Sequence, residues 1–314
     1  MTPAVLAVDA GQTEIRAALA DGGRGPRTAT APGVLRMGGP VGPEQVSAGL
    51  LAAVAGLGRL PQPVPSAAVG LSGFEAAEDD LRQVGEVLRR ELALERLAIA
   101  SDGLTSLLGA LGDRDGAVVA AGTGTVCVAR RGERLVKVDG WGPLLGDAGS
   151  GFAIGRAGLD AALRHADGRG GSEALLRAAE RRYAPLPGLP ERIYALPVPA
   201  PAIAAFAVDV TRAALAGDAS ALAILERAAR ELALTACAAV DRLFEPDQPA
   251  TVSYAGKVFR AGALVTDPFT RAVAERRPGT DVVPPAGDAL AGAALLAGLA
   301  GALRPEPGIL WTAR

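Results

Sequence analysis

Two glycine-containing turns carry the residue types that bind phosphate groups. Each turn lies between two short apolar runs. The run before the first turn is residues 5–8, and the run before the second turn is residues 117–120. Each is therefore predicted as the turn of a β-hairpin. The turn residues are Gly11, Gln12 and Thr13 in the first motif and Gly122, Thr123 and Gly124 in the second. A turn that lacks a Cβ exposes backbone N–H groups, and such a concavity binds phosphate oxygens. Most glycine turns in hairpins bind no ligand. Taken singly, each motif could therefore be a turn without a phosphate-binding role.

Asp9 ends the first apolar run, directly before the first turn. A carboxylate at the end of a buried strand costs desolvation energy unless it meets a cation. A hydrated Mg²⁺ that bridges nucleotide phosphates is the natural partner at such a place. The sequence therefore predicts Asp9 as a magnesium ligand.

Asp102 follows the apolar run 97–100 and precedes a predicted helix over 103–111. One interpretation is an N-cap, because Asp is a favoured cap residue. The other is a general base that accepts the proton of a primary hydroxyl during phosphoryl transfer, which requires only hydrogen-bond reach of that hydroxyl. Taken alone, the residues favour the cap.

Other common catalytic sites lack their residues. His165 is the only histidine, and no Gly-x-Ser-x-Gly elbow accompanies it. Zinc sites lack the necessary histidines and cysteines. Lys257 is not part of a Walker A loop, and no Gly-x-Gly-x-x-Gly follows the first strand. The side chains expected to transfer protons are therefore mostly those of Asp and Glu.

The composition is that of an ordinary globular chain. Of 314 residues, 49% are hydrophobic and 21% charged, and the net charge is −2 without a basic block. Binding to nucleic acid or to a membrane surface is not expected. Cys127 and Cys237 lie in apolar stretches, which favours buried, inert thiols. Without a signal segment or an apolar run of about 18 residues, the predicted location is the cytoplasm.

Strands that alternate with helices position these motifs, and the strand–glycine turn–strand pattern occurs twice. The predicted strands are residues 5–8, 15–19, 28–31, 67–71, 97–100, 117–120, 126–130, 135–138, 251–254 and 281–283. The predicted helices are residues 43–57, 78–91, 103–111, 152–165, 172–182, 202–215, 220–243 and 288–303, with a proline-rich loop at 185–201. The duplication and the alternation predict an α/β fold of two domains. We expect one domain over 1–110 with the C-terminal helix (288–314), and the other, with a helical insertion, over 111–287.

Three motifs resemble, in order, the first phosphate, second phosphate and adenosine motifs of the sugar kinase/Hsp70/actin superfamily. They are Asp9-Ala10-Gly11-Gln12-Thr13, Ala121-Gly122-Thr123-Gly124-Thr125 and Tyr254-Ala255-Gly256-Lys257-Val258-Phe259. The segment 140–151 (GWGPLLGDAGSG) is similar to the Gly-Trp-Gly…Gly-Asp-Glu-Gly-Ser segment of N-acetylglucosamine kinases, within the BadF/BadG/BcrA/BcrD ATPase family. The resemblance implies two ribonuclease-H-like domains that close over ATP and a sugar in an interdomain cleft. A homodimer is left open.

The resemblance also implies roles for individual residues. The implied ATP and phosphate contacts are Gly11, Gln12, Thr13, Gly122, Thr123, Gly124, Gly256, Phe259, Gly287 and Asp288. The implied sugar contacts are Ser72, Trp141, Gly142, Asp147 and His165. Asp102 falls where these kinases keep the catalytic base, which reverses the preference for the cap. Asp147 keeps a structural alternative, an acid satisfied by the surrounding glycine backbone, and Trp141 could be a core residue.

Departures from the family pattern bear on the substrate. Gln12 stands where many relatives have Gly, and Glu14 where many have Lys. Ala148 replaces the Glu of Gly-Asp-Glu-Gly-Ser, which lies close to the sugar. The polar segment 165–173 is either a solvated loop or a lid that brings His165 or an acid to the sugar. This pattern is closer to actinobacterial glucosamine kinases and favours glucosamine over N-acetylglucosamine.

Three functions compete. The favoured one is an ATP-dependent hexosamine 6-kinase, for glucosamine or alternatively N-acetylglucosamine. A second is the ATPase branch that activates 2-hydroxyacyl-CoA dehydratases, which needs cysteines that hold an iron–sulfur cluster. A third is a sugar-responsive repressor, which would need an N-terminal helix-turn-helix, and the predicted first strand begins too early for one.

Overall fold

The computed structural model describes residues 4–11, 14–22, 25–33, 42–72, 78–299 and 301–313. The chain divides into two compact units. Unit 1 comprises residues 1–118, 128–137 and 283–314, and unit 2 comprises residues 119–127 and 138–282. The division at residue 110 expected from the sequence stays a prediction.

Unit 1 is built on a six-stranded mixed sheet with the order β11-β5-β4-β1-β2-β3. Its strands are β1 (Val5–Ala10), β2 (Glu14–Ala20), β3 (Arg27–Pro32), β4 (Ser66–Leu71), β5 (Leu97–Ser101) and β11 (Leu310–Ala313). β1 pairs with β2 in antiparallel and with β4 in parallel orientation, which confirms the predicted hairpin. β4 and β5 are buried along their whole length, as central parallel strands must be. Residues 310–313 were not predicted as a strand, and β11 joins the edge antiparallel to β5.

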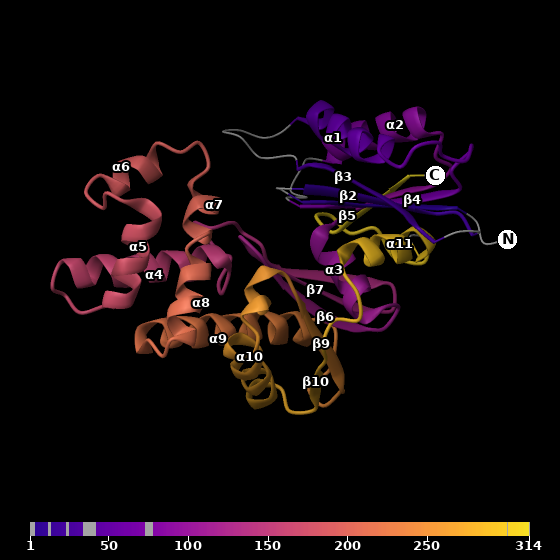
Figure 1. Ribbon diagram of the computed structural model, residues 1–314. Helices are drawn as coiled ribbons and strands as arrows, with labels where there is room; N and C mark the ends of the chain where they lie inside the picture. The colour runs from indigo at the N-terminus through magenta and orange to yellow at the C-terminus, as the bar shows by residue number, and fades with distance from the viewer. Residues whose placement is uncertain are drawn as a thin grey trace. The chain divides into compact units, whose positions relative to one another are not determined.

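Helices cover both faces of this sheet (Figure 1). The pair α1 (Pro43–Ala55) and α2 (Glu78–Leu92) lies on one face, and α3 (Asp102–Leu111) and α11 (Ala289–Leu299) lie on the other. Two glycines let α3 and α11 approach closely. A Cβ on Gly292 would lie 1.8 Å from Thr105 O, and one on Gly109 would lie 2.0 Å from Asp288 O. α11 contacts β1 and β4 of this sheet and ends at Leu299, earlier than the predicted C-terminal helix, and the assignment of that helix to the first domain stays a prediction.

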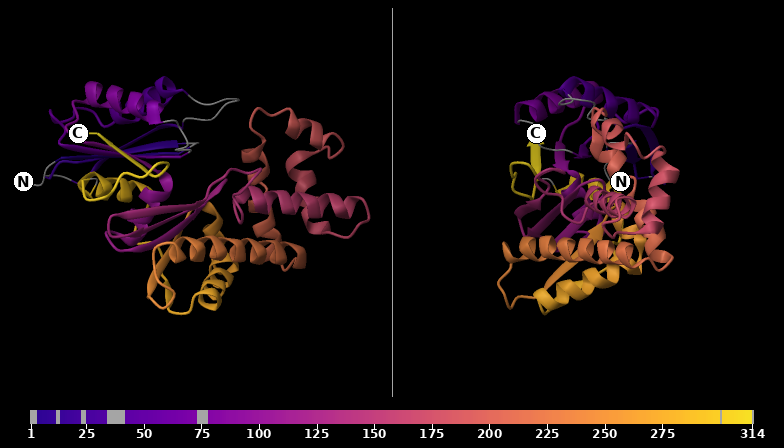
Figure 2. Two further views of the ribbon diagram at one scale, coloured as in Figure 1. Left: turned by 180° about the vertical axis from the view of Figure 1, so that it is seen from behind. Right: turned by 90° about the vertical axis from the view of Figure 1, so that its left-hand side faces the viewer.

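The second sheet has five strands in the order β10-β9-β6-β7-β8. Its strands are β6 (Gly116–Ala121), β7 (Thr125–Arg131), β8 (Arg134–Asp139), β9 (Ala250–Ala255) and β10 (Thr280–Val282). The helices of unit 2 are α4 (Gly151–Ala166), α5 (Glu173–Tyr183), α6 (Leu189–Tyr194), α7 (Pro199–Ala204), α8 (Ala207–Leu215), α9 (Ala219–Asp241) and α10 (Ala263–Arg276), with the 3₁₀ turn η1 (Lys257–Ala261). In Figure 2, α9 and α10 pack side by side.

Two sequence expectations for unit 2 were wrong. The stretch 185–201 is not a continuous loop, because α6 and the start of α7 lie in it, each with a proline in the first turn. Proline is well tolerated there because the first N–H groups of a helix have no intrahelical partner. α10 was missed, and its internal Pro268 normally signals a helix break.

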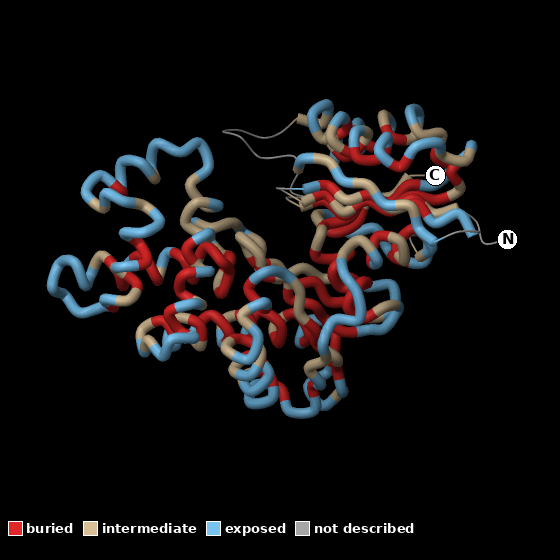
Figure 3. The backbone as a smooth tube through the Cα atoms, in the orientation of Figure 1, coloured by how far each residue is buried: buried red, intermediate tan, exposed pale blue. Residues whose placement is uncertain are grey.

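Burial follows the sheets and the inward faces of the helices, while the outer helix faces are exposed (Figure 3). In the described ranges, no single helix has both the length and the apolar composition to cross a bilayer. The segments Pro199–Leu215 and Ala219–Asp241 pass that test only as a pair, bent by 120°.

Candidate active site

In unit 1, Asp102 lies at the junction of β5 and α3, next to the end of β4. Ser101, and not Asp102, caps α3, since its hydroxyl accepts the N–H of Leu104 at 3.3 Å. Ser72 donates its hydroxyl to Asp102 Oδ2 at 2.6 Å. The N–H of Ser72 donates to Ala10 O at 3.0 Å, which ties this place to the end of β1. The cap interpretation of Asp102 is therefore wrong.

The surroundings of Asp102 favour its protonated form. Desolvation raises the pKa of the Asp102 carboxyl above its usual value, and the nearby charge of Asp9 adds to this. The hydrogen bond from Ser72 and the charge of Lys137 act in the opposite direction. A carboxylate with a raised pKa is a better proton acceptor than an ordinary aspartate.

Asp9 is held by an arginine that the sequence analysis missed. Arg16 of β2 donates through Nη2 and Nε to Asp9 Oδ2, at 2.6 and 3.2 Å. Arg16 Nη1 also donates to Asp288 Oδ2 at 2.6 Å, so it links the two acids. Asp9 and Arg16 are directly opposite in the β1–β2 register, and this cross-strand pair was the available sequence signal.

The surroundings of Asp9 fit a hydrated Mg²⁺. Both Arg16 contacts use Oδ2, and no donor within the described ranges contacts Oδ1. The same ranges hold no group of three His, Cys, Asp or Glu side chains that could form a closed metal site. Mg²⁺ typically takes one or two carboxylates, several waters and substrate phosphates, so one partly buried carboxylate beside the predicted phosphate turn suits it.

The first turn is closed by the N–H of Gly11, which donates to Glu14 O at 2.9 Å. A Cβ on Gly11 would lie 3.1 Å from the same oxygen, a tight contact that glycine avoids. Gln12 and Thr13 lie outside the described residues. Gly287 and Asp288 belong to unit 1, where Asp288 accepts the N–H of Ala291 at the start of α11.

In unit 2, the second turn is tied to the start of α4. The N–H of Gly122 donates to Gly124 O at 2.8 Å and closes the turn. Gly151 N and Phe152 N then donate to Gly122 O and Thr123 O, at 2.8 and 3.1 Å. The positive end of α4 therefore stands at the predicted phosphate turn, an arrangement that favours anions.

Asp147 lies beside the same turn. Its carboxylate packs on Gly124, where an added Cβ would lie 2.5 Å from Asp147 Oδ2, and only 6% of the residue is exposed. Asp139, which the sequence analysis missed, organises the loop before it. Asp139 Oδ1 accepts the N–H groups of Gly140 and Asp147, at 2.8 and 2.9 Å, and Oδ2 accepts that of Ala148 at 3.2 Å.

The predicted adenosine motif also meets the end of β6. Gly256 has φ = 96°, and a Cβ there would lie 2.3 Å from Ala121 O. Phe259 is buried and stacks on Tyr254 at 4.6 Å between ring centroids. Phe259 therefore fixes η1 from inside, and Gly256 keeps the motif against the second turn.

Other predicted sugar residues are distributed unevenly. Trp141 is 73% exposed, so the core interpretation is wrong, and Gly142 follows it with φ = 83°. His165 is exposed at the far end of α4. At 1.5 Å per residue it is about 20 Å along the helix axis from the loop that holds Asp147. The structure thus groups Trp141, Gly142 and Asp147 and does not bring His165 to them.

Residues 6–297 match the sequence pattern of the BadF/BadG/BcrA/BcrD ATPase family. The chain belongs to this family. An N-acetylmuramic acid/N-acetylglucosamine kinase of Clostridium acetobutylicum is 30% identical over 249 residues, which cover 77% of this chain and 81% of that protein.

Solved structures share the fold of this BadF/BadG/BcrA/BcrD ATPase family member. A protein of Chromobacterium violaceum assigned as an N-acetylglucosamine kinase superimposes with a TM-score of 0.71 at 26% identity, covering 94% of this chain and 98% of that one. A ROK family glucokinase of Streptomyces griseus, solved with glucose and AMPPNP, has a TM-score of 0.58 at 21% identity over 94% of this chain and 98% of the other. The predicted α/β fold of the sugar kinase superfamily is thereby confirmed.

Proposed function

We propose that this protein is an ATP-dependent kinase that phosphorylates the 6-hydroxyl of an amino sugar. The observation that carries the proposal is Asp102, which does not cap its helix, is hydrogen-bonded by Ser72 and lies near Asp9. The names of the Clostridium acetobutylicum and Chromobacterium violaceum proteins, both linked to N-acetylglucosamine, support an amino sugar as acceptor. Because ATP is the phosphoryl donor, the cytoplasm stays the predicted location.

Each unit contributes different chemistry. Asp102 accepts the proton of the sugar hydroxyl, and Ser72 orients its carboxylate. Asp9 would hold Mg²⁺, which neutralises charge on the transferring phosphoryl group. In unit 2, the positive end of α4 at the Gly122–Gly124 turn would attract phosphate oxygens, while the N–H groups of Gly122, Gly151 and Phe152 stay bound to the backbone oxygens to which they donate. Positioning and electrostatics account for most of the catalysis in such a transfer.

The dehydratase-activating ATPase is disfavoured by the cysteines. Cys127 and Cys237 are both free and buried, with 0% and 4% exposure. Desolvation raises the pKa of both thiols, which disfavours the thiolate form that binds an iron–sulfur cluster. Neither is presented at a surface where a second subunit could share a cluster.

As the acceptor we propose glucosamine, with N-acetylglucosamine as the second candidate. Ala148 supports glucosamine because the N-acetylglucosamine kinases that the 140–151 segment resembles have Glu there, so this site differs from the standard N-acetyl site. The names of the two relatives favour the acetylated sugar. Because His165 lies at the far end of α4 from the loop that holds Asp147, the 165–173 segment supports neither sugar.

We expect a higher kcat/KM for glucosamine than for N-acetylglucosamine. The carboxylate that would contact the ammonium is Asp147, the remaining acid among the predicted sugar residues; one such charge-assisted contact is worth about 10- to 150-fold, and acetylation removes it. A coupled assay of ADP release at pH 7–8 with each sugar measures the ratio. A higher kcat/KM for the acetylated sugar would establish the second candidate, and no sugar-dependent ADP release with either would contradict the proposed function.

Gly124→Ala should weaken sugar binding about tenfold or more, because the new Cβ displaces the Asp147 carboxylate and costs one charge-assisted hydrogen bond. Gly122→Ala is the matched control, since a Cβ at this position has nothing within 4 Å. The sugar Kd is measured by calorimetry without nucleotide. Equal sugar Kd values for the two variants would show that Asp147 does not contact the sugar.

A further inference from the structure

Arg16 of β2 holds one oxygen of each of two acids in unit 1. Its Nη2 and Nε donate to Asp9 Oδ2, at 2.6 and 3.2 Å, and its Nη1 donates to Asp288 Oδ2 at 2.6 Å. Asp288 Oδ1 accepts the N–H of Ala291 at 3.0 Å, so both oxygens of that carboxylate have donors. Among the described residues, Asp9 Oδ1 is therefore the oxygen of these two acids that no donor contacts.

The contact between Arg16 and Asp9 is fixed by the sheet. The two residues are directly opposite in the antiparallel β1–β2 register, so their side chains lie on the same face. With 33% and 16% of their side chains exposed, they form a pair that solvent screens less than a surface pair. A guanidinium presents its N–H donors in a rigid, planar fork. Arg16 therefore determines which oxygen of Asp9 remains for a cation.

One available carboxylate oxygen suits a small cation better than a large one. Mg²⁺ keeps several waters and needs only one or two carboxylates, in near-octahedral geometry. Ca²⁺ takes about six to eight oxygen ligands and often both oxygens of one carboxylate. For Asp9 to use both oxygens, Oδ2 would have to exchange two N–H groups of Arg16 for the cation. The arrangement therefore leaves the ligand that Mg²⁺ needs and withholds one that Ca²⁺ prefers.

We propose that Arg16 determines metal specificity: it makes Asp9 a single-oxygen ligand, so that Mg²⁺ is favoured over Ca²⁺ as the cation of the bound nucleotide. The inference rests on the role of Asp9 in the proposed function and adds which cation the site selects. Arg16 is a positioning residue here, because it acts on the cation through Asp9.

The test compares wild-type protein with Arg16→Met in binding Mg²⁺·ADP and Ca²⁺·ADP, measured by calorimetry without sugar. Methionine has an unbranched side chain without a donor, so Asp9 Oδ2 becomes available. We expect the ratio of the Ca²⁺·ADP Kd to the Mg²⁺·ADP Kd to fall by about tenfold, the scale of one charge-assisted contact. The ratio is the readout because removal of a positive charge favours both cations, which have the same charge.

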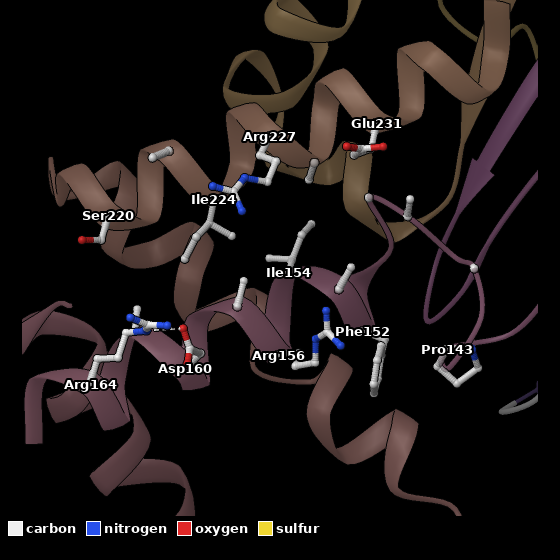
Figure 4. A pocket seen from close by; sticks show the side chains of 18 residues that line it. Pro143, Phe152, Ile154, Arg156, Asp160, Arg164, Ser220, Ile224, Arg227 and Glu231 are labelled. Atoms are coloured by element: carbon white, nitrogen blue, oxygen red, sulfur yellow. Dashed lines mark hydrogen bonds and ion pairs between the residues drawn. The ribbon is translucent and has the colours of Figure 1, made fainter. Parts of the chain in front are cut away.

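Two further variants are matched controls. Asp288→Asn weakens the other contact of Arg16 and leaves Asp9 Oδ2 bound, so the Kd ratio should stay at the wild-type value. Arg227→Met makes the same change of charge and side chain in unit 2. Arg227 lines a pocket of about 580 Å³ between α4 and α9 (Figure 4), and in the part of the chain that the structure describes it pairs with no acid. Its removal frees no carboxylate oxygen, so this ratio should also stay unchanged.

An unchanged Kd ratio in Arg16→Met overturns the inference. Wild-type protein that binds the two complexes equally well, or binds neither, overturns it too. If thermal unfolding shows that Arg16→Met does not fold, Arg16→Gln takes its place. Its amide replaces the fork with a single neutral donor group, so we expect a smaller fall of about two- to fivefold, and an unchanged ratio again contradicts the inference.

The same measurement separates this inference from the kinase proposal. Calorimetry with ADP needs no turnover, so the Kd ratio is decided even if no sugar is phosphorylated. Absence of sugar-dependent ADP release would contradict the kinase proposal and leave the metal selectivity standing. An unchanged ratio together with sugar phosphorylation would leave the kinase proposal standing and remove the role of Arg16.

Discussion

Asp102→Asn will keep the fold and ATP binding and lower kcat by roughly 10²–10⁴, the range for loss of a general base. The fold should survive because Ser101 caps α3 and the amide oxygen of Asn can still accept the Ser72 hydroxyl. The amide cannot take a proton from the sugar. Steady-state kinetics with saturating sugar and nucleotide binding by calorimetry measure the two effects.

The pH profile gives an independent check on the same residue. The pKa of Asp102 is raised by desolvation, so its carboxylate is protonated at a higher pH than an ordinary aspartate. Since the base must be unprotonated, kcat/KM should fall as the pH decreases through this raised value, and the acid limb should vanish in Asp102→Asn. Near-normal turnover of the variant would exclude Asp102 as the base.

Asp9→Ala will lower kcat/KM for Mg²⁺·ATP by about 100-fold or more and leave the sugar Kd nearly unchanged, because an interaction with the metal is worth several kcal/mol. The loss should be partly offset by raising the Mg²⁺ concentration. The variant should also shift the acid limb of the pH profile downward, since the charge of Asp9 raises the pKa of Asp102.

Asp288→Asn is the comparison for Asp9→Ala. It weakens the other contact of Arg16, at 2.6 Å, and leaves the Asp9 carboxylate in place. Its effect on Mg²⁺ dependence should be much smaller, because Asp288 is more than half exposed, with 56% of its side chain accessible. Equal losses of sugar binding and Mg²⁺·ATP use in Asp9→Ala would indicate misfolding instead of loss of a metal ligand.

The local pattern of the sequence was sufficient for most elements. An apolar run or an amphipathic spacing depends only on neighbours a few residues away. Such patterns predicted the bounds of β1, β4, β5 and α2 to within one or two residues. The glycine turns were recognisable for the same reason. Elements without a local pattern were missed, such as the edge strand β11, which exists because it pairs with β5.

The arrangement of the candidate site depended on contacts that no local pattern encodes. Arg16, which binds Asp9, also binds Asp288, 272 positions further along the chain. Asp139 acts because the chain returns to it eight and nine residues later, and His165 leaves the site because a helix carries it away. Residue types and spacing therefore determined which chemistry was available. Only the tertiary structure decided which groups meet, because meeting depends on how the helices and strands pack.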